Sequence, residues 1–107
     1  MDNKQTCDSY TAIDVKDLLE IDELQPGVVY LEEGHNGKPW LAAFLCPCGC
    51  GEACHCIIRG MVQGHTGPSW TLTNNDSGVT LFPSVHRIPE RTCGAHFFLE
   101  NGRIKWC

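Results

Sequence analysis

Three cysteines alternate with proline and glycine in the segment 46–51, Cys-Pro-Cys-Gly-Cys-Gly. In an extended backbone, side chains at i, i+2 and i+4 point to one face, so Cys46, Cys48 and Cys50 can converge on one point. The glycines let the backbone bend around that point. Thiols this close in sequence bridge poorly as disulfides, whereas three thiolates suit a soft divalent ion. The segment therefore predicts a Zn²⁺ site, and the alternative is a set of redox-active or partly oxidised thiols.

The remaining zinc ligands can come from the segment Cys93-x-x-His96, in two ways. In the first arrangement, zinc takes two thiols of the run together with Cys93 and His96. In the second, the three thiols of the run, Cys46, Cys48 and Cys50, join Cys93 in a closed Cys₄ site. A closed site is structural, because no coordination position remains to activate water. The second arrangement leaves His96 free beside the metal.

Ser84 follows a predicted strand and is a candidate nucleophile. Its hydroxyl would need an adjacent base to take its proton, and histidine suits that task. A free His96 could be this base, with His86 as a second candidate, and backbone N–H groups of segments 48–51 and 93–95 could hold the oxyanion. Against this interpretation, a serine after proline is usually a turn or cap residue, and a histidine at this spacing from a cysteine is often a zinc ligand. Candidates for a third member that orients the base are Glu52, Asp76 and Glu90.

These residues must be positioned by short strands, since apolar, β-branched and aromatic runs alternate with turn signals. Asn101-Gly102 is a hairpin turn, and Pro83 is expected to end a strand and open a loop toward Arg91. The predicted strands cover residues 28–31, 40–45, 57–62, 70–73, 79–82, 97–100 and 103–107.

A short amphipathic helix is predicted ahead of these strands. Thr11 and Asp14 resemble a capping box, and the apolar residues that follow favour a helix over residues 12–20. The fold expected is mostly β, a small antiparallel open barrel or sandwich with one short N-terminal helix, stabilised by zinc.

The bulk composition limits the function classes. The 107 residues suggest a single domain, with residues 1–9 as a flexible tail and 10–25 as the helix and a linker. The net charge of -5 argues against nucleic acid as a partner. There is no apolar run long enough to span a membrane, and the polar N-terminus favours a cytoplasmic location, where thiols stay reduced. The cysteines without an assigned role are Cys7, Cys54, Cys56 and Cys107.

An ordered set of motifs resembles a known bacterial family. The motifs are Cys-Pro-Cys-Gly-Cys-Gly at 46–51, Trp-x-Leu at 70–72, Thr-Leu-x-Pro-Ser-Val at 80–85, Cys-x-x-His-Phe-Phe at 93–98 and Asn-Gly-Arg-Ile-x-Trp-Cys at 101–107. They are similar to a small Cys-rich domain family of unknown function. That family is encoded beside ubiquitin-like modifiers and their E1-like and E2-like enzymes, in gene clusters associated with anti-phage defence. The likeness covers roughly residues 26–107.

The resemblance implies a serine peptidase that matures the ubiquitin-like modifier or removes it from its targets. It implies Ser84 as the nucleophile and His96 as the base. This role fits the closed site in which Cys46, Cys48, Cys50 and Cys93 hold a structural zinc and His96 stays free. The expected partners are the modifier and its conjugates, and the E1-like and E2-like enzymes, with the extended modifier tail pairing along a sheet edge. Two alternatives stay open: a non-catalytic zinc-binding adaptor of the same pathway, and a metallopeptidase with a catalytic zinc.

Overall fold

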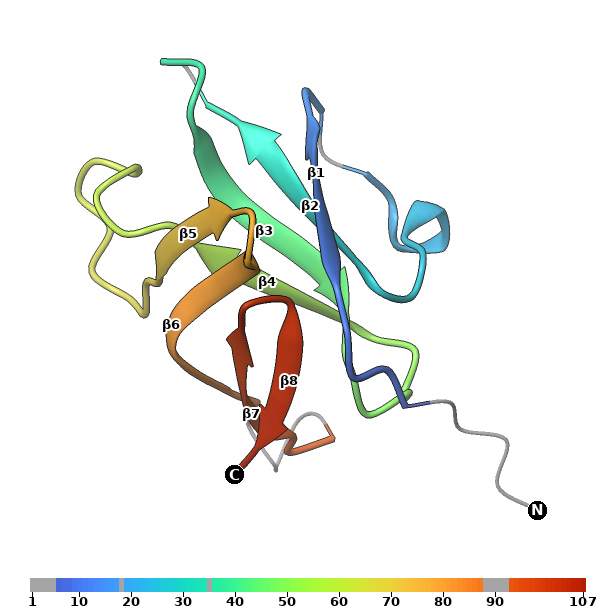
Figure 1. Cartoon of the computed structure of the whole chain (residues 1–107). Helices are drawn as coiled ribbons and strands as arrows, with labels where there is room; N and C mark the ends of the chain where they lie inside the picture. The colour runs from blue at the N-terminus through green and yellow to red at the C-terminus, as the bar shows by residue number, and fades with distance from the viewer. Residues whose placement is uncertain (1–5, 18, 35, 88–92) are drawn as a thin grey trace.

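The computed structural model describes residues 6–17, 19–34, 36–87 and 93–107. This part of the chain forms two four-stranded sheets and one short 3-10 helix, η1 (Figure 1). The first sheet has the order β1-β2-β3-β4, with bounds Thr11–Val15, Val28–Glu33, Pro39–Leu45 and Ala53–Ile57. The second has the order β5-β6-β7-β8, with bounds Thr71–Asn75, Gly78–His86, His96–Glu100 and Arg103–Trp106.

Neighbouring strands are antiparallel with one exception. β1 pairs with β2 in parallel, Thr11 opposite Val28, and the connection between them contains η1 (Ile21–Glu23). The other five pairings join strands that follow each other in the chain. The prediction of a mostly β fold is confirmed, and the parallel pair was not anticipated.

The predicted helix over residues 12–20 is wrong, because this stretch begins with a strand. Ile13 and Val15 are β-branched, which restricts their χ1 angles in a helix and suits a pleated strand. Pairing along β2 then decides the outcome. The helical turn comes later, at η1, where the Glu20 N–H donates to Glu23 Oε1 at 2.8 Å and completes a capping box.

Two predicted strand boundaries are also wrong. The third strand was expected over residues 57–62, but β4 ends at Ile57, and Cys54 and Cys56 lie within it with buried side chains. Pro83 was expected to end its strand, but β6 continues through it to His86.

A bulge explains how proline is accommodated in β6. Leu81 pairs with Leu99 and Val85 pairs with Phe97, so three residues on β6 stand opposite the single residue Phe98 on β7. Bulged residues are outside the regular hydrogen-bond ladder, where a proline, which has no N–H, is tolerated. The bulge therefore keeps Leu81 and Val85 both on the core side while the strand bends between them.

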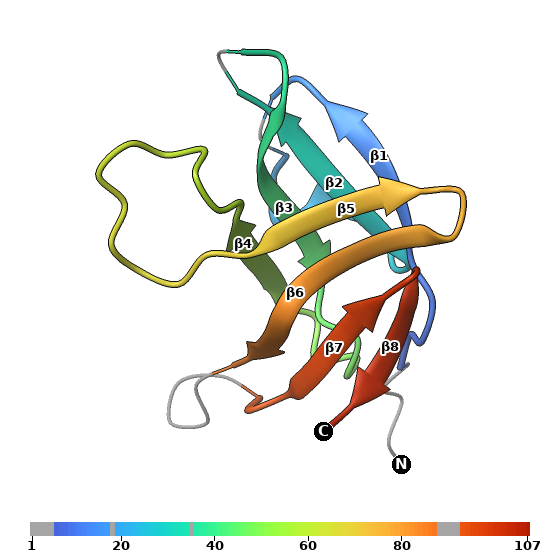
Figure 2. The ribbon, with the colours of Figure 1, turned by 60° about the vertical axis from the view of Figure 1, so that its left-hand side comes forward.

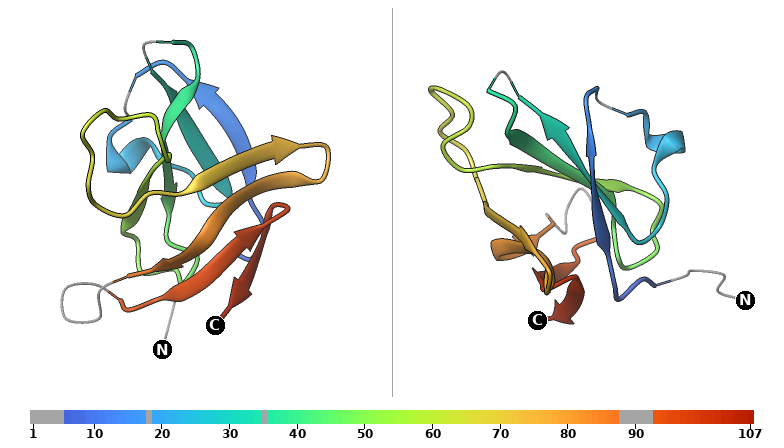
Figure 3. Two further views of the ribbon diagram at one scale, coloured as in Figure 1. Left: turned by 90° about the vertical axis from the view of Figure 1, so that its left-hand side faces the viewer. Right: turned by 45° about the horizontal axis from the view of Figure 1, so that its top comes forward.

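One hydrophobic core lies between the two sheets. In Figures 2 and 3, β5 and β6 run across the strands of the first sheet rather than along them. At the centre, Phe44 of β3 and Phe97 of β7 are fully buried and meet edge-on, with ring centroids 6.3 Å apart. The described strands form two sheets that do not close into a barrel, which agrees with the predicted open barrel or sandwich and does not separate the two. The described residues contain no helix that is long and apolar enough to cross a membrane.

The first described residues are attached to the β3–β4 loop and to the second sheet. The Cys7 N–H donates to the Pro47 carbonyl at 2.9 Å, and Ser9 forms a bridge with Arg103. Residues 1–5 of the predicted tail lie outside the described residues.

A substitution at Gly78, the first residue of β6, tests how closely this strand packs on the β7–β8 turn. Its φ is +122°, and an added Cβ would lie 2.5 Å from the carbonyl carbon of Asn101. Gly60, with φ +81° and no atom within 4 Å of an added Cβ, is the matched control. We expect Gly60→Ala to cost about 1 kcal/mol of backbone strain and Gly78→Ala to cost about 1–3 kcal/mol more. Urea unfolding checks this, and equal losses for the two variants would contradict the packing described.

Candidate functional site

Ser84 and His96 lie next to each other on neighbouring strands. The Ser84 Oγ is 2.9 Å from His96 Nε2, which is hydrogen-bond distance. Ser84 belongs to the bulge of β6, and His96 is the first residue of β7. Because His86 pairs with His96, and Ser84 lies two residues before His86, all three side chains share one face of the sheet. Both members of the Ser84–His96 pair are half-buried.

The Ser84 backbone accepts a hydrogen bond from Trp70, a residue that also pairs with the end of the first sheet. The Trp70 indole N–H donates to the Ser84 carbonyl at 3.2 Å. Trp70 itself bridges in parallel to Ile58, just beyond β4. Sequence reasoning did not single out Trp70 for this contact, because a backbone carbonyl acceptor leaves no signal in the sequence. The contact limits how far the Ser84 backbone can move relative to His96.

His86 packs against the His96 ring instead of bonding to Ser84. The two imidazoles are stacked, with centroids 4.3 Å apart and planes 18° from parallel. The Ser84 hydroxyl is bonded to His96, so His86, the second candidate base, is a ring neighbour in this arrangement. Stacking restricts rotation of the His96 ring and so helps to keep Nε2 directed at Ser84.

The carboxylates considered as a third member take other roles where the structure describes them. Glu52 forms an ion pair with Arg87 at 3.3 Å. Asp76 lies in the β5–β6 turn beside Gly78, at the opposite end of β6 from Ser84. Glu90 lies outside the described residues. Among the described carboxylates, neither candidate is hydrogen-bonded to His96.

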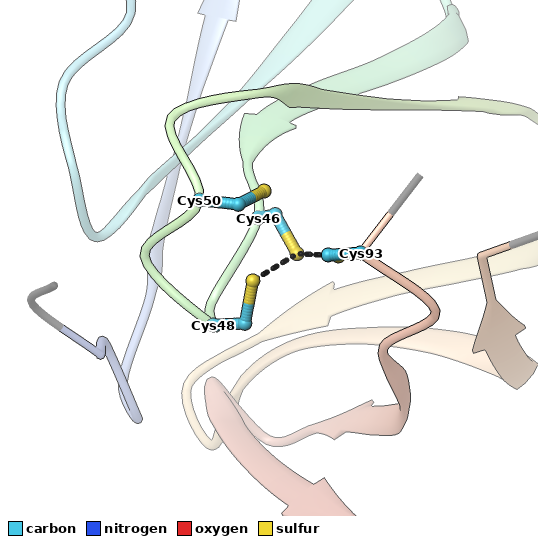
Figure 4. Close-up of side chains that lie close together, drawn as sticks. All are labelled: Cys46, Cys48, Cys50 and Cys93. Carbon is cyan, nitrogen blue, oxygen red and sulfur yellow. Dashed lines mark hydrogen bonds between the residues drawn. The ribbon is translucent and has the colours of Figure 1, made fainter. Parts of the chain in front are cut away.

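The sulfur atoms of four cysteines converge on one point, and one of them, Cys93, lies three residues before His96 in the chain (Figure 4). Cys46, Cys48 and Cys50 come from the β3–β4 loop, and Cys93 comes from the segment that leads into β7. The four Sγ atoms all lie within 4.8 Å of one another, with Cys46 3.5 Å from Cys48 and 3.6 Å from Cys93. A tetrahedral ion with metal–sulfur bonds of about 2.3 Å would place the sulfurs about 3.8 Å apart. The four cysteines therefore could hold one metal ion.

Backbone groups of the loop are arranged around the sulfurs. The backbone N–H groups of Cys48, Cys50 and Ala95 act on the sulfurs of Cys46, Cys48 and Cys93 respectively, and each lowers the pKa of the thiol that it faces. Such N–H···S bonds favour the thiolate form that metal ligation needs.

The glycines of the loop make its bends possible. Gly49 and Gly51 both have φ of +86°, a left-handed conformation that other residues rarely adopt. The Gly49 N–H donates to the Cys46 carbonyl at 3.1 Å, and the Cys46 N–H donates to the Glu52 carbonyl at 2.8 Å. This turn brings alternate side chains to one point, as the spacing predicted.

The surroundings shift the pKa values of the clustered thiols in opposite directions. A hydrogen bond from the Cys54 thiol lowers the pKa of Cys46 to about 4, although burial opposes this effect. Burial raises the pKa of Cys48 to about 12 and also raises the pKa of Cys93. The protein alone thus favours a thiolate at Cys46, and a cation at the centre would favour thiolates at the other positions as well.

Arg87 connects the cluster to the strand that carries Ser84. Its Nη1 donates to Cys50 Sγ at 3.7 Å, its Nη2 contacts Glu52, and its backbone N–H donates to the Ala95 carbonyl at 2.8 Å. A guanidinium beside the sulfurs offsets part of the negative charge that thiolates bring. Sequence reasoning did not identify Arg87, since it is remote from the cysteine motifs in the chain.

The other cysteines lie outside the cluster of four. All eight are unbridged. Cys56 is buried in the core, where burial raises its pKa to about 12, and Cys54 is buried beside Cys46 as a hydrogen-bond donor. Cys107 is exposed, and Cys7 Sγ contacts the Ser9 carbonyl at 3.1 Å. His96 is not grouped with the sulfurs, and its Nε2 faces Ser84.

Comparison with known proteins assigns the chain to a family. No curated protein and no solved structure matches the chain. A family model described as the bacterial ubiquitination-like system serine protease (BubE) matches residues 15–107. The match covers the Ser84–His96 pair, all four clustered cysteines and every strand from β2 to β8, and it begins ahead of the segment in which the sequence motifs were recognised. The chain therefore belongs to the BubE family of serine proteases of bacterial ubiquitination-like systems.

Proposed function

We propose that this protein is a peptidase of a ubiquitin-like conjugation system, with Ser84 as the nucleophile and His96 as the general base. The observation that carries the proposal is the 2.9 Å contact between Ser84 Oγ and His96 Nε2 in a chain of a serine protease family. A hydroxyl bonded to a neutral imidazole nitrogen is the arrangement that activates serine. The Trp70 bond and the His86 stack hold the two partners in place.

The chemistry proceeds in two halves. Ser84 Oγ attacks a carbonyl carbon at the end of the modifier, and His96 Nε2 accepts the hydroxyl proton as the C–O bond forms. His96 then returns that proton to the leaving amine or alcohol as the scissile bond breaks. Water repeats the sequence on the acyl-enzyme, with His96 as the base again, and releases the modifier with a free carboxylate.

We infer that the cluster of four cysteines binds a structural Zn²⁺. Four thiolates fill a tetrahedral zinc, so no position remains for water or substrate. The ion would tie the β3–β4 loop to Cys93, three residues before His96 in the sequence. Zinc would supply this cross-link, and the chain's own residues would carry out the bond cleavage.

Two other functions are less well supported. A catalytic zinc would need an open position, which four clustered sulfurs do not leave, and His96 faces Ser84 instead of the sulfurs. A non-catalytic adaptor would not need a serine within hydrogen-bond distance of a histidine. The substrate we propose is a ubiquitin-like modifier, either as a precursor or joined to a target, and E1-like and E2-like enzymes are the expected companions.

Replacing Ser84 tests the nucleophile. We expect Ser84→Ala to lower cleavage of a modifier precursor at least about a thousandfold and to abolish labelling by a fluorophosphonate. Ser77→Ala, in the exposed β5–β6 turn, is the matched control and should behave as wild type. A folded Ser84→Ala protein that still cleaves the precursor at the wild-type rate would rule out the serine mechanism.

A double variant tests whether Ser84 and His96 act as one unit. His96→Asn should cost about as much activity as Ser84→Ala, and the double variant should be hardly worse than either, because residues of one catalytic unit are not additive. Additive losses in kcat would show that the two residues act separately.

Removing one sulfur tests the metal. We expect wild type to carry about one zinc ion per chain, Cys48→Ser to lose it, and exposed Cys107→Ser to keep it, as measured by native mass spectrometry. Chelation of the wild-type zinc should unfold the β3–β4 loop and lower the melting temperature. Full zinc occupancy in Cys48→Ser would contradict the ligand set.

Trp70→Phe tests the bond to the Ser84 carbonyl. The ring is kept and the N–H is lost, so we expect kcat to fall about tenfold with KM nearly unchanged, because the nucleophile is held less firmly. Trp40→Phe is the matched control, since its indole N–H donates to Glu32 Oε2 at 2.6 Å, away from Ser84. Equal kcat values for the two variants would exclude a positioning role for Trp70.

A further inference from the structure

Two exposed phenylalanines lie on the same face of the second sheet as the Ser84–His96 pair. Phe82 is 61% exposed and Phe98 is 38% exposed, although both belong to strands whose other large apolar side chains are buried. Phe82 precedes Ser84 by two residues on β6, and Phe98 follows His96 by two residues on β7. Alternate residues of a strand share a face, so each phenylalanine extends the surface of one member of the pair.

The bulge in β6 lies opposite Phe98, and Phe82 and Phe98 border the same hollow. Phe98 is the single β7 residue opposite the bulged segment that runs from Phe82 to Ser84. Phe82 and Phe98 line one hollow of about 290 Å³. Sites for drug-sized ligands span roughly 300–1,000 Å³, so this hollow suits one side chain of a bound peptide.

The polar groups around the hollow already have partners. Lys105 Nζ is 2.6 Å from Glu100 Oε1, and Thr80 Oγ1 accepts a hydrogen bond from the Asn101 N–H at 2.9 Å. A ligand in the hollow would therefore gain chiefly by covering the two aromatic rings. That gain comes from removing apolar surface from water, and it favours an apolar side chain over a polar one of the same size.

We infer that the Phe82–Phe98 hollow binds an apolar side chain of the substrate's extended tail, within two residues of the scissile bond. The inference rests on the proposed function, since it takes Ser84 as the point of attack. An extended peptide advances about 3.3 Å per residue, so a tail whose carbonyl lies at Ser84 reaches the hollow with one of its first residues. Phe82 and Phe98 are thus specificity-determining residues, and the preferred tails carry leucine or a similar residue near the cleavage point.

Peptidyl diphenyl phosphonates provide the test, because they label a reactive serine without the rest of the modifier. Ser84 Oγ forms a bond to phosphorus, a P–O bond to phenol breaks, and phenol leaves with the proton that His96 received. Four tripeptide reagents carry leucine or the isosteric asparagine at the first or second residue before phosphorus, and the rate of labelling is followed by intact mass.

We expect wild type to prefer leucine over asparagine at least about tenfold at one of the two positions. Phe82→Ala and Phe98→Ala should reduce this ratio to about twofold or less, and Phe82→Leu should keep most of it. Ile13→Ala, at an exposed position of β1 in the other sheet, is the control and should keep the wild-type ratio.

The outcomes separate the two proposals. If a small fluorophosphonate fails to label Ser84, the proposed function fails and this inference fails with it. If the fluorophosphonate labels Ser84 but wild type shows no leucine preference, or Phe82→Ala and Phe98→Ala keep it, the hollow is not a substrate subsite and the serine mechanism still stands.

Discussion

The convergence of four sulfurs from two sheets is the constraint on which the rest of the structure depends. Cys46, Cys48 and Cys50 follow a strand of the first sheet, and Cys93 precedes a strand of the second. Thiols at this separation bring several potential negative charges into a small volume, and a shared cation would be the physical means of holding them there. The proposed ion would then fix the approach of the chain to His96, three residues beyond Cys93.

The bulge in β6 interrupts the regular antiparallel pairing of β6 with β7 at the Ser84–His96 pair, the candidate site. A regular ladder would pair every residue of the strand, and a proline would break it. With the bulge, Leu81 and Val85 keep their places in the core while the residues between them turn outward. Ser84 is thereby carried by a strand that is anchored on both sides of it, which gives its hydroxyl a defined position without a separate loop.

Aromatic and indole groups contact the Ser84–His96 pair, whereas the two described carboxylate candidates, Glu52 and Asp76, are not hydrogen-bonded to His96. A stacked His86 ring and the Trp70 N–H act on the two partners, whereas the ion pair of Glu52 serves Arg87 and the sulfur cluster. The exposed phenylalanines lie beyond them on the same sheet. This face of the sheet thus has a polar centre with apolar neighbours, a combination suited to a peptide that must be both held and cleaved.

The sequence by itself determined the β character of this protein and which residues are candidates for chemistry, because both depend on local patterns. The 46–51 spacing indicated a metal site, and short β-branched and aromatic runs indicated strands. Tertiary contacts decided the rest. Pairing with β2 made residues 11–15 a strand where local periodicity suggested a helix, and the β6–β7 register carried β6 through Pro83. Whether His96 faces sulfur or hydroxyl depends on how two strands and a loop pack, and residue spacing alone contains no information about that choice.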